Sequence, residues 1–263
     1  MKILFFVSLG LYGAAFLVQL AGDCVKKEGA KKLAWILYLL GFGVHLAYFV
    51  WRGVVAQRLP LASQFEFACG FALGIPVVLV LLRNRMDLDW IAAAGMGATL
   101  LVQGYASFQR MEINALMPAL RSFWFVYHIG AAALSYSIFL VAACVAGRYV
   151  HQYRKGEPGD SLKMIQLEEM SFQLTALGYL LLTTVIVIGA VWAEAAWSAY
   201  WTWDPKEVWA LITWIIYTVY FHLRVGRKKD RYWLCWYVIL AVPAFLFTFA
   251  GVNKLIPGLH SYG

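Results

Sequence analysis

Residues 200–209, YWTWDPKEVW, separate two long apolar runs of the chain. Six of the chain's 12 tryptophans lie in or near this stretch, at positions 192, 197, 201, 203, 209 and 214. Asp204 precedes a proline, and Glu207 stands three residues after Asp204. This order is typical of a helix start, because Asp caps the first turn, Pro fits it and Glu bonds back to the cap. The pattern predicts that a helix begins here.

The apolar runs on either side of this stretch, and along the rest of the chain, indicate the fold class. Of the 263 residues, 62% are hydrophobic and 14% are charged, which is far too apolar for a soluble domain of this length. A helix that crosses a lipid bilayer needs roughly 20 apolar residues. Eight runs reach or approach that length, at residues 3–22, 33–51, 66–82, 90–108, 123–147, 174–195, 207–223 and 232–252. We therefore predict an all-α integral membrane protein with about eight transmembrane helices, forming one polytopic domain over residues 1–263.

The basic residues predict the orientation of these helices. The net charge is +8, but 15 of the 22 Lys and Arg residues fall on one side of the eight predicted spans. The seven on the other side are Lys2, Arg52, Arg58, Arg110, Arg121, Lys206 and Lys254. By the positive-inside rule the first side is cytoplasmic, so both termini and the tryptophan-rich residues are predicted to be external. The charge thus reports topology in the lipid bilayer, and we expect no nucleic-acid partner.

Residues 192–214, called the tryptophan segment below, have two interpretations. A single tryptophan at a membrane surface usually belongs to the interfacial aromatic belt. Six on one side of the membrane are more than a belt needs. Indole rings offer flat apolar surfaces against which a planar macrocycle can stack. The segment therefore favours a haem-binding surface, with an exaggerated aromatic belt as the alternative.

Histidines are the candidate axial ligands for a haem iron. His128 and His260 flank the tryptophan segment and share its predicted side of the membrane. His45 lies roughly 19 Å above the start of its predicted span, whereas His222 lies only about 3 Å above Arg224, at about 1.5 Å per residue. These two depths do not match, so His45 and His222 are not expected to share one iron. A second ligand for His222 would have to come from another chain.

The cysteines point to no covalent attachment of haem to this chain. Cys24, Cys69, Cys144 and Cys235 are scattered, without a CxxC pair, zinc-site spacing or a CxxCH motif. Any haem held by this chain is therefore expected to be bound non-covalently.

Four stretches together resemble the haem-handling proteins that carry a tryptophan-rich WWD segment, and within them the CcsA (ResC) group of System II cytochrome c synthases. The stretches are AWSAYWTWDPKEVWALITWIIYTVYFHLR, YHIGAAALSYSIF, LPLASQFEFACGF and the C-terminal GVNKLIPGLHSYG. They occur in family order and cover most of the chain beyond residue 45. One residue departs from the pattern, because Ser198 follows Trp197 where the family usually has Gly.

This resemblance implies a function in cytochrome c biogenesis. A protein of this kind presents haem b (iron protoporphyrin IX) on the outer side of the membrane and supports its thioether attachment to the CxxCH motif of apocytochrome c. It acts as a haem lyase subunit together with a CcsB-like membrane subunit. The implied location is the bacterial inner membrane, with the thylakoid membrane less favoured.

The resemblance also implies roles for particular residues. His128 and His260 would be the external axial ligands of the iron, and His222 would be the intramembrane ligand. The tryptophans implied to contact haem are Trp192, Trp197, Trp201, Trp203 and Trp209. Asp204 would shape the segment, either by capping a helix or by bonding to a histidine or a haem propionate. No role carries over to His45.

Two other functions share some of these features. A CcmC-like protein has the WWD segment and loads haem onto a chaperone, but its pattern has fewer spans and lacks the GLHSYG ending. A membrane haem b electron carrier would need paired histidines at matching depths on facing helices, and this sequence offers no such pair. We therefore favour the synthase interpretation.

Overall fold

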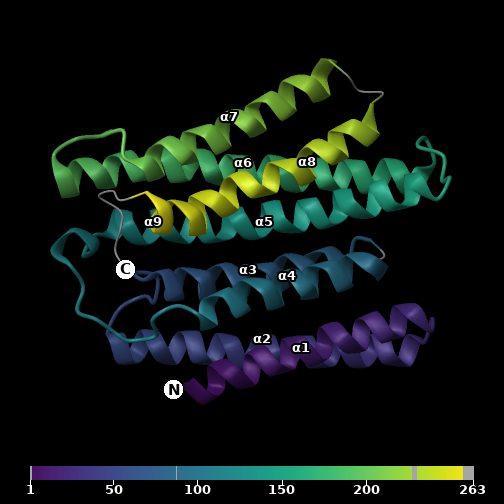
Figure 1. Ribbon diagram of the computed structural model, residues 1–263, viewed down its shortest axis with the longest axis horizontal. Coiled ribbons are helices and arrows are strands. Elements are labelled where there is room, and N and C mark those ends of the chain that lie inside the picture. Colours follow the sequence, from purple (N-terminus) through teal and green to yellow (C-terminus); the bar gives the residue numbers. More distant parts are fainter. Residues whose placement is uncertain (1, 87, 227–229, 257–263) are drawn as a thin grey trace. The chain divides into compact units, whose positions relative to one another are not determined.

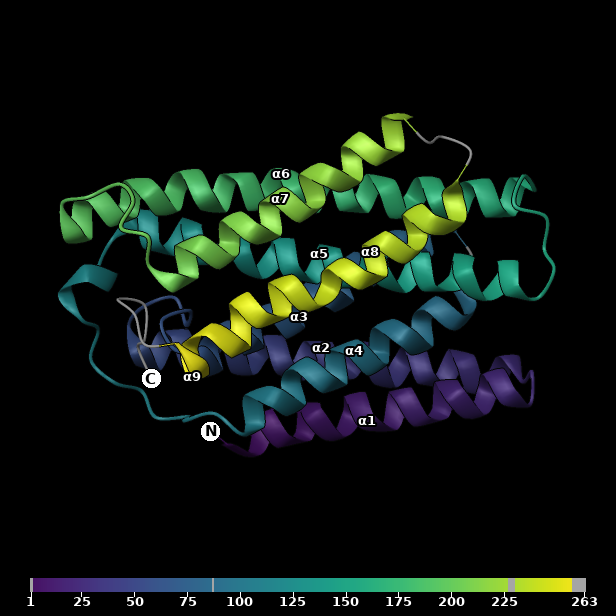
Figure 2. The same ribbon diagram turned by 45° about the horizontal axis from the view of Figure 1, so that its top comes forward.

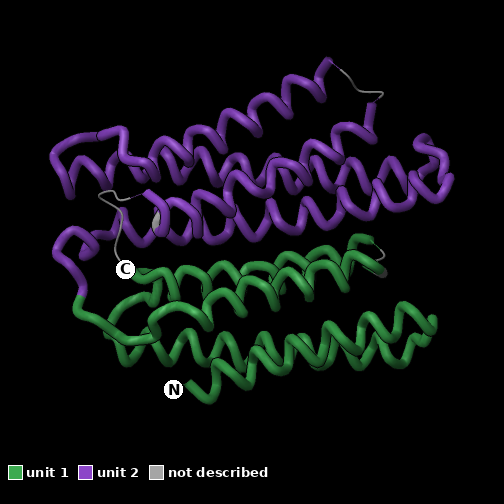
Figure 3. The backbone as a smooth tube through the Cα atoms, viewed as in Figure 1, with its two compact units in different colours: residues 1–115 green, residues 116–263 purple. Residues whose placement is uncertain are grey.

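The computed structural model describes residues 2–86, 88–226 and 230–256 (Figure 1). These residues form helices and connections without any strand. Eight long helices lie at the positions of the eight apolar runs, so the all-α class is confirmed. Two compact units divide the chain, Met1–Ala115 and Leu116–Gly263 (Figure 3). That they form one continuous membrane domain stays a prediction.

Unit 1 is a closed bundle of four helices. These are α1 (Lys2–Cys24), α2 (Glu28–Ala56), α3 (Gln64–Arg83) and α4 (Asp89–Ser107). Helices α1 and α3 each pack against both α2 and α4, which closes the ring. Some of the polar groups inside it are paired: the Tyr38 and Thr99 hydroxyls lie 2.7 Å apart, and Gln103 donates to Ser8 at 2.6 Å.

Unit 2 is a second bundle of four long helices. It begins with the 3-10 turn Pro118–Leu120 and continues with α5 (Phe123–Arg154), α6 (Leu162–Trp197), α7 (Pro205–Gly226) and α8 (Arg231–Leu246). Helices α5 and α7 each pack against both α6 and α8 (Figure 2). The start of α5, the α6–α7 connection and the end of α8 therefore lie together at one end of this unit (Figure 1).

Two features of unit 2 differ from the expected spans. Helix α6 begins at Leu162, twelve residues before the apolar run, because the Ser161 hydroxyl caps it and no helix breaker follows. Helix α8 passes into a π turn, Phe247–Gly251, before the short helix α9 (Val252–Leu255). A π turn adds one residue to a helical turn, so it changes the direction in which the following residues point.

The lengths and compositions of these helices suit a lipid bilayer. Among the described residues, seven helical segments are long and apolar enough to cross a membrane: α1, α2, α3, α5, α6, α7 and Arg231–Gly251. Helix α4 has 19 residues and carries the buried polar side chains Thr99 and Gln103. The chain is therefore a multi-pass membrane protein.

Candidate functional site

His128 lies near the start of α5, and its imidazole is fixed against α6. Its Nδ1 is 2.8 Å from the backbone oxygen of Val185. A carbonyl oxygen only accepts hydrogen bonds, so Nδ1 carries the proton in this contact. In the neutral imidazole the lone pair is then on Nε2. A backbone partner that fixes the tautomer in this way is typical of metal-binding histidines.

The indole of Trp192 packs against the same imidazole. The two rings are stacked, with centroids 5.9 Å apart and planes 20° apart. The indole itself is only 1% exposed, and its Nε1 donates to the backbone oxygen of Ala119 at 2.9 Å. Phe125 packs against it with a centroid distance of 5.4 Å. Trp192 is therefore a rigid wall for His128 and not an open surface.

The connection between α6 and α7 contains two residues in the left-handed region. Ser198 has φ 59° and Trp203 has φ 60°. Such a conformation is unusual for a bulky side chain and needs support from its surroundings. The Glu207 carboxylate supplies it by accepting hydrogen bonds from the backbone nitrogens of Thr202, at 2.8 Å, and Asp204, at 3.2 Å. Glu207 thus holds both neighbours of Trp203, whose indole is 71% exposed.

Asp204 caps helix α7, as the sequence predicts. Its carboxylate accepts a hydrogen bond from the backbone nitrogen of Lys206 at 2.9 Å. Its backbone oxygen accepts a hydrogen bond from the backbone nitrogen of Val208 at 3.0 Å. Its side chain is buried, and α7 begins at the following residue, Pro205. The helix start predicted for this stretch is therefore confirmed.

The tryptophans of the segment do not form one flat surface. The rings of Trp192 and Trp197 meet at 75°, and those of Trp201 and Trp203 meet at 88°. Trp209 packs instead on Phe247, in the π turn, at a centroid distance of 4.3 Å. The indoles at this end of unit 2 therefore face in several directions.

The other histidines occupy different places. His260 lies outside the described residues, although α9, which leads toward it, is at the same end of unit 2 as the tryptophan segment (Figure 1). His222 is exposed near the opposite end of α7, with its Nδ1 3.0 Å from the backbone oxygen of Thr218. His45 belongs to unit 1, where it is buried against Tyr12 with neither ring nitrogen bonded to any described residue. The structure thus brings only His128 to the tryptophans among its described histidines.

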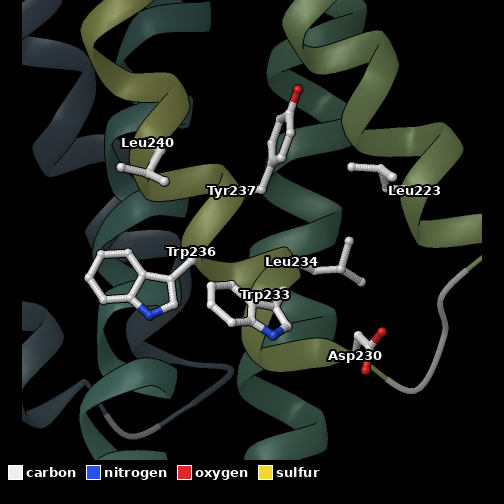
Figure 4. A pocket seen from close by; sticks show the side chains of 7 residues that line it. All are labelled: Leu223, Asp230, Trp233, Leu234, Trp236, Tyr237 and Leu240. Atoms are coloured by element: carbon white, nitrogen blue, oxygen red, sulfur yellow. The ribbon is translucent and has the colours of Figure 1, made fainter.

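A cavity of about 240 Å³ lies between α7 and α8 (Figure 4). It is lined by Leu223, Asp230, Trp233, Leu234, Trp236, Tyr237 and Leu240. Leu223 is near the end of α7, Asp230 precedes α8, and the other five residues belong to α8, so the cavity is remote from the tryptophan segment at the start of α7. The volume is below that of ordinary small-molecule pockets, which hold roughly 300–1,000 Å³. We therefore do not include this cavity in the candidate site.

Sequence reasoning missed the residues of α6 and of the 3-10 turn that hold His128 and Trp192, namely Val185, Gly189 and Ala119. The sequence does contain a pattern that could have indicated Val185 and Gly189, since positions 185, 189 and 192 share one face of a helix. The pairing of that face with His128 depends on how α5 and α6 pack, which the sequence did not show.

The family model of the cytochrome C assembly protein matches residues 59–260, more than half of the chain. The chain belongs to the cytochrome c assembly protein family. Its place in cytochrome c biogenesis follows from this membership.

Two relatives in this family match almost the entire chain. The cytochrome c biogenesis protein CcsA of Synechococcus sp. (strain CC9311) is 30% identical, with 98% of this chain and 97% of the relative covered. The CcsA protein of Parasynechococcus marenigrum (strain WH8102) is also 30% identical, with coverages of 97% and 95%. Thus the match to these cytochrome c assembly proteins includes the first helices, which lie before the matched part of the family model.

The fold of this family member also resembles a solved structure. The chain of the cytochrome c haem lyase CcmF superposes with a TM-score of 0.77 at 18% sequence identity. The match covers 94% of this chain and 46% of the CcmF chain, so this chain spans less than half the length of that protein. At this identity the likeness is evidence for the fold alone.

The residues at this end of unit 2 fit the haem that the family name implies. The Trp197 indole nitrogen is buried and has no hydrogen-bond partner among the described residues. A buried donor of this kind normally has a partner. His128 offers an imidazole nitrogen, and the surrounding indoles offer apolar surface. The donor set is therefore suited to an iron macrocycle with polar substituents.

Replacing Ser198 with glycine should stabilise this member of the family. Ser198 ends α6 in the left-handed conformation, where an L side chain costs roughly 1–2 kcal/mol. Part of the stability gained by removing this strain is lost, because glycine is more flexible than serine in the unfolded chain. We expect the midpoint of thermal unfolding in detergent, followed by tryptophan fluorescence, to rise by a few degrees. Ser198→Ala, which keeps the strain, should not raise it; a lower midpoint for Ser198→Gly would contradict the strain argument.

Proposed function

We propose that this protein holds haem b non-covalently at the end of unit 2 that contains the tryptophan segment, and presents it for attachment to apocytochrome c. The observation that carries the proposal is the fixed imidazole of His128, which is bonded to Val185 and stacked on Trp192. His128 would be one axial ligand. His260, outside the described residues, would be the other.

Thioether formation between haem and apocytochrome c needs no nucleophile from this chain, because the substrate supplies its own thiols. When bound, haem supplies the iron and the two vinyl groups that become thioethers. In each attachment a cysteine sulfur of the CxxCH motif bonds to a vinyl carbon, and the thiol hydrogen ends on the neighbouring carbon, so no further reactant is consumed. The chain's own contribution is orientation, which alone can supply a large part of a rate enhancement.

Each part of the site has a distinct role in this proposal. His128 and His260 fix the iron, and Trp192 keeps His128 in place. Trp201, Trp203 and Trp209 supply apolar surface around the macrocycle, while the Trp197 nitrogen donates a hydrogen bond to one of its polar groups. Asp204 and Glu207 act indirectly, because they hold the backbone around Trp203 and the start of α7.

His222 would bind haem at the other end of unit 2, before its transfer to the external site. The exposure of His222 supports this, since a histidine on the surface of a membrane helix is costly unless something covers it. A CcsB-like membrane subunit would supply the second ligand there. The bacterial inner membrane, with the tryptophan segment outside, is the location we propose.

The test is the absorption spectrum of the protein purified in detergent with its CcsB-like partner. We expect the variant His128→Ala with His260→Ala to lose or shift the haem absorption band, because both external ligands are gone. His151→Ala, which removes a histidine from the other end of α5, is the matched control and should leave the spectrum unchanged. An identical spectrum for the double variant would place any haem elsewhere, and the tryptophans would then be an aromatic belt.

A further inference from the structure

We propose that Gly189 is a positioning residue, present in α6 so that the imidazole of His128 can reach Val185 and Trp192. The inference rests on the proposed function only in taking His128 as an iron ligand. The packing itself is independent of haem.

Gly189 lies on the face of α6 that contacts His128. A Cβ atom at position 189 would lie 2.7 Å from Cε1 and 2.8 Å from Nδ1 of His128, which is closer than real Cβ atoms approach other atoms. The conformation of α6 does not require glycine here, since left-handed residues occur only at its C-terminal cap. Glycine weakens the interior of a helix relative to alanine. Its presence is therefore explained by the space that the imidazole occupies.

The imidazole cannot keep its place if a side chain is added at position 189. Trp192 is fixed on one side, because it is buried and bonded to Ala119. The Val185 oxygen belongs to the same rigid helix as position 189. The ring of His128 must therefore move away from α6, and its hydrogen bond to Val185 must lengthen or break. That bond sets the tautomer and direction of the ligand nitrogen, so both would become variable.

The same helix contains a matched control. A Cβ atom at Gly178 would lie 2.8 Å from two ring atoms of Phe139 in α5. Gly178→Ala thus crowds the α5–α6 packing as severely as Gly189→Ala, three helical turns away from His128. A purely structural role for Gly189 would give the two variants the same properties.

The first experiment measures how fast diethyl pyrocarbonate modifies His128 in the haem-free protein, by mass spectrometry of the peptide. Loss of one hydrogen bond corresponds to roughly a two- to tenfold change in an equilibrium. We expect Gly189→Ala to raise the rate at His128 by about fivefold and Gly178→Ala to leave it unchanged. Equal rates for the two variants would overturn the inference.

The second experiment compares absorption spectra of the haem-loaded complex. Gly189→Ala should reproduce the change caused by His128→Ala, and the double variant should show no additional change, because both substitutions act on one ligand. Gly178→Ala should match the unsubstituted protein. If His128→Ala changes the spectrum but Gly189→Ala does not, the inference fails while the proposed function stands. If His128→Ala has no effect, the proposed function fails, and the modification rates alone decide on Gly189.

Discussion

Replacing Arg52 with alanine is expected to lower the free energy of unfolding by about 3–5 kcal/mol, because it leaves a buried carboxylate without one of its two arginine partners. Arg52 is 1% exposed and Glu66 is 0% exposed. The Arg52 Nε lies 2.9 Å from Glu66, and its two terminal nitrogens donate to the backbone oxygens of Met111 and Glu112, at 2.8 and 3.1 Å. This one guanidinium thus joins the end of α2, the start of α3 and the chain after α4.

A second arginine does not replace Arg52 in this network. Arg58 also contacts the Glu66 carboxylate, at 2.7 Å, but its side chain is 13% exposed and it does not reach Met111 or Glu112 in any described contact. Removal of Arg52 therefore leaves Glu66 only half compensated and two backbone oxygens without their donor. Both losses destabilise the native state.

Denaturant unfolding in detergent, followed by tryptophan fluorescence, would measure this loss. Arg110→Ala removes a positive charge from an exposed residue of the same unit and is the matched control, with an expected change within about 0.5 kcal/mol. Arg52→Met combined with Glu66→Met should be less destabilising than Arg52→Ala alone, since no half-compensated carboxylate is left in the interior. If Arg52→Ala behaves like Arg110→Ala, the ion pair has no importance for stability.

The helices could be predicted from the sequence because their signals are local. A run of apolar residues long enough for a bilayer predicts a helix wherever it packs, and the Asp204, Pro205 and Glu207 pattern predicts the start of α7 from neighbouring residues alone. The sequence indicates a short amphipathic helix from Ser161, but its polar residues do not show that this helix is continuous with the apolar run at 174–195. Helix propensity and the Ser161 cap continue the helix through them.

The arrangement of the site could be predicted only in part. The sequence gathers the tryptophans into one segment, and it places His128 on the same predicted side of the membrane. It does not show that Trp192 is buried behind His128. That arrangement depends on two long-range contacts: His128 with Val185, which are 57 positions apart, and Trp192 with Ala119, which are 73 positions apart. The π turn is equally non-local, because Thr248, within it, lies 3.3 Å from the backbone oxygen of Trp209 on another helix.

Replacing His222 with alanine is expected to lower the haem content of the purified complex at least tenfold, with a similar fall in the yield of holocytochrome c. Loss of residues that merely support a metal ligand commonly costs 10–100-fold in affinity, so loss of a ligand should cost no less. The fold should survive, because His222 is exposed and its ring contacts its own helix through Thr218. Haem absorbance per protein and haem staining of the cytochrome product would measure the two effects.

The design of this test separates ligation from other effects of the substitution. His151→Ala removes a histidine from the same end of unit 2, where α5 ends and α7 ends, and should leave both quantities unchanged. Added imidazole should restore haem to His222→Ala, because it can occupy the position of the lost ring and coordinate the iron, whereas it cannot correct a misfolded helix. Full haem content in His222→Ala would show that haem reaches the tryptophan segment without a site on α7. Low haem that imidazole does not restore would indicate that His222 contributes to the surface for the partner subunit and does not bind the iron.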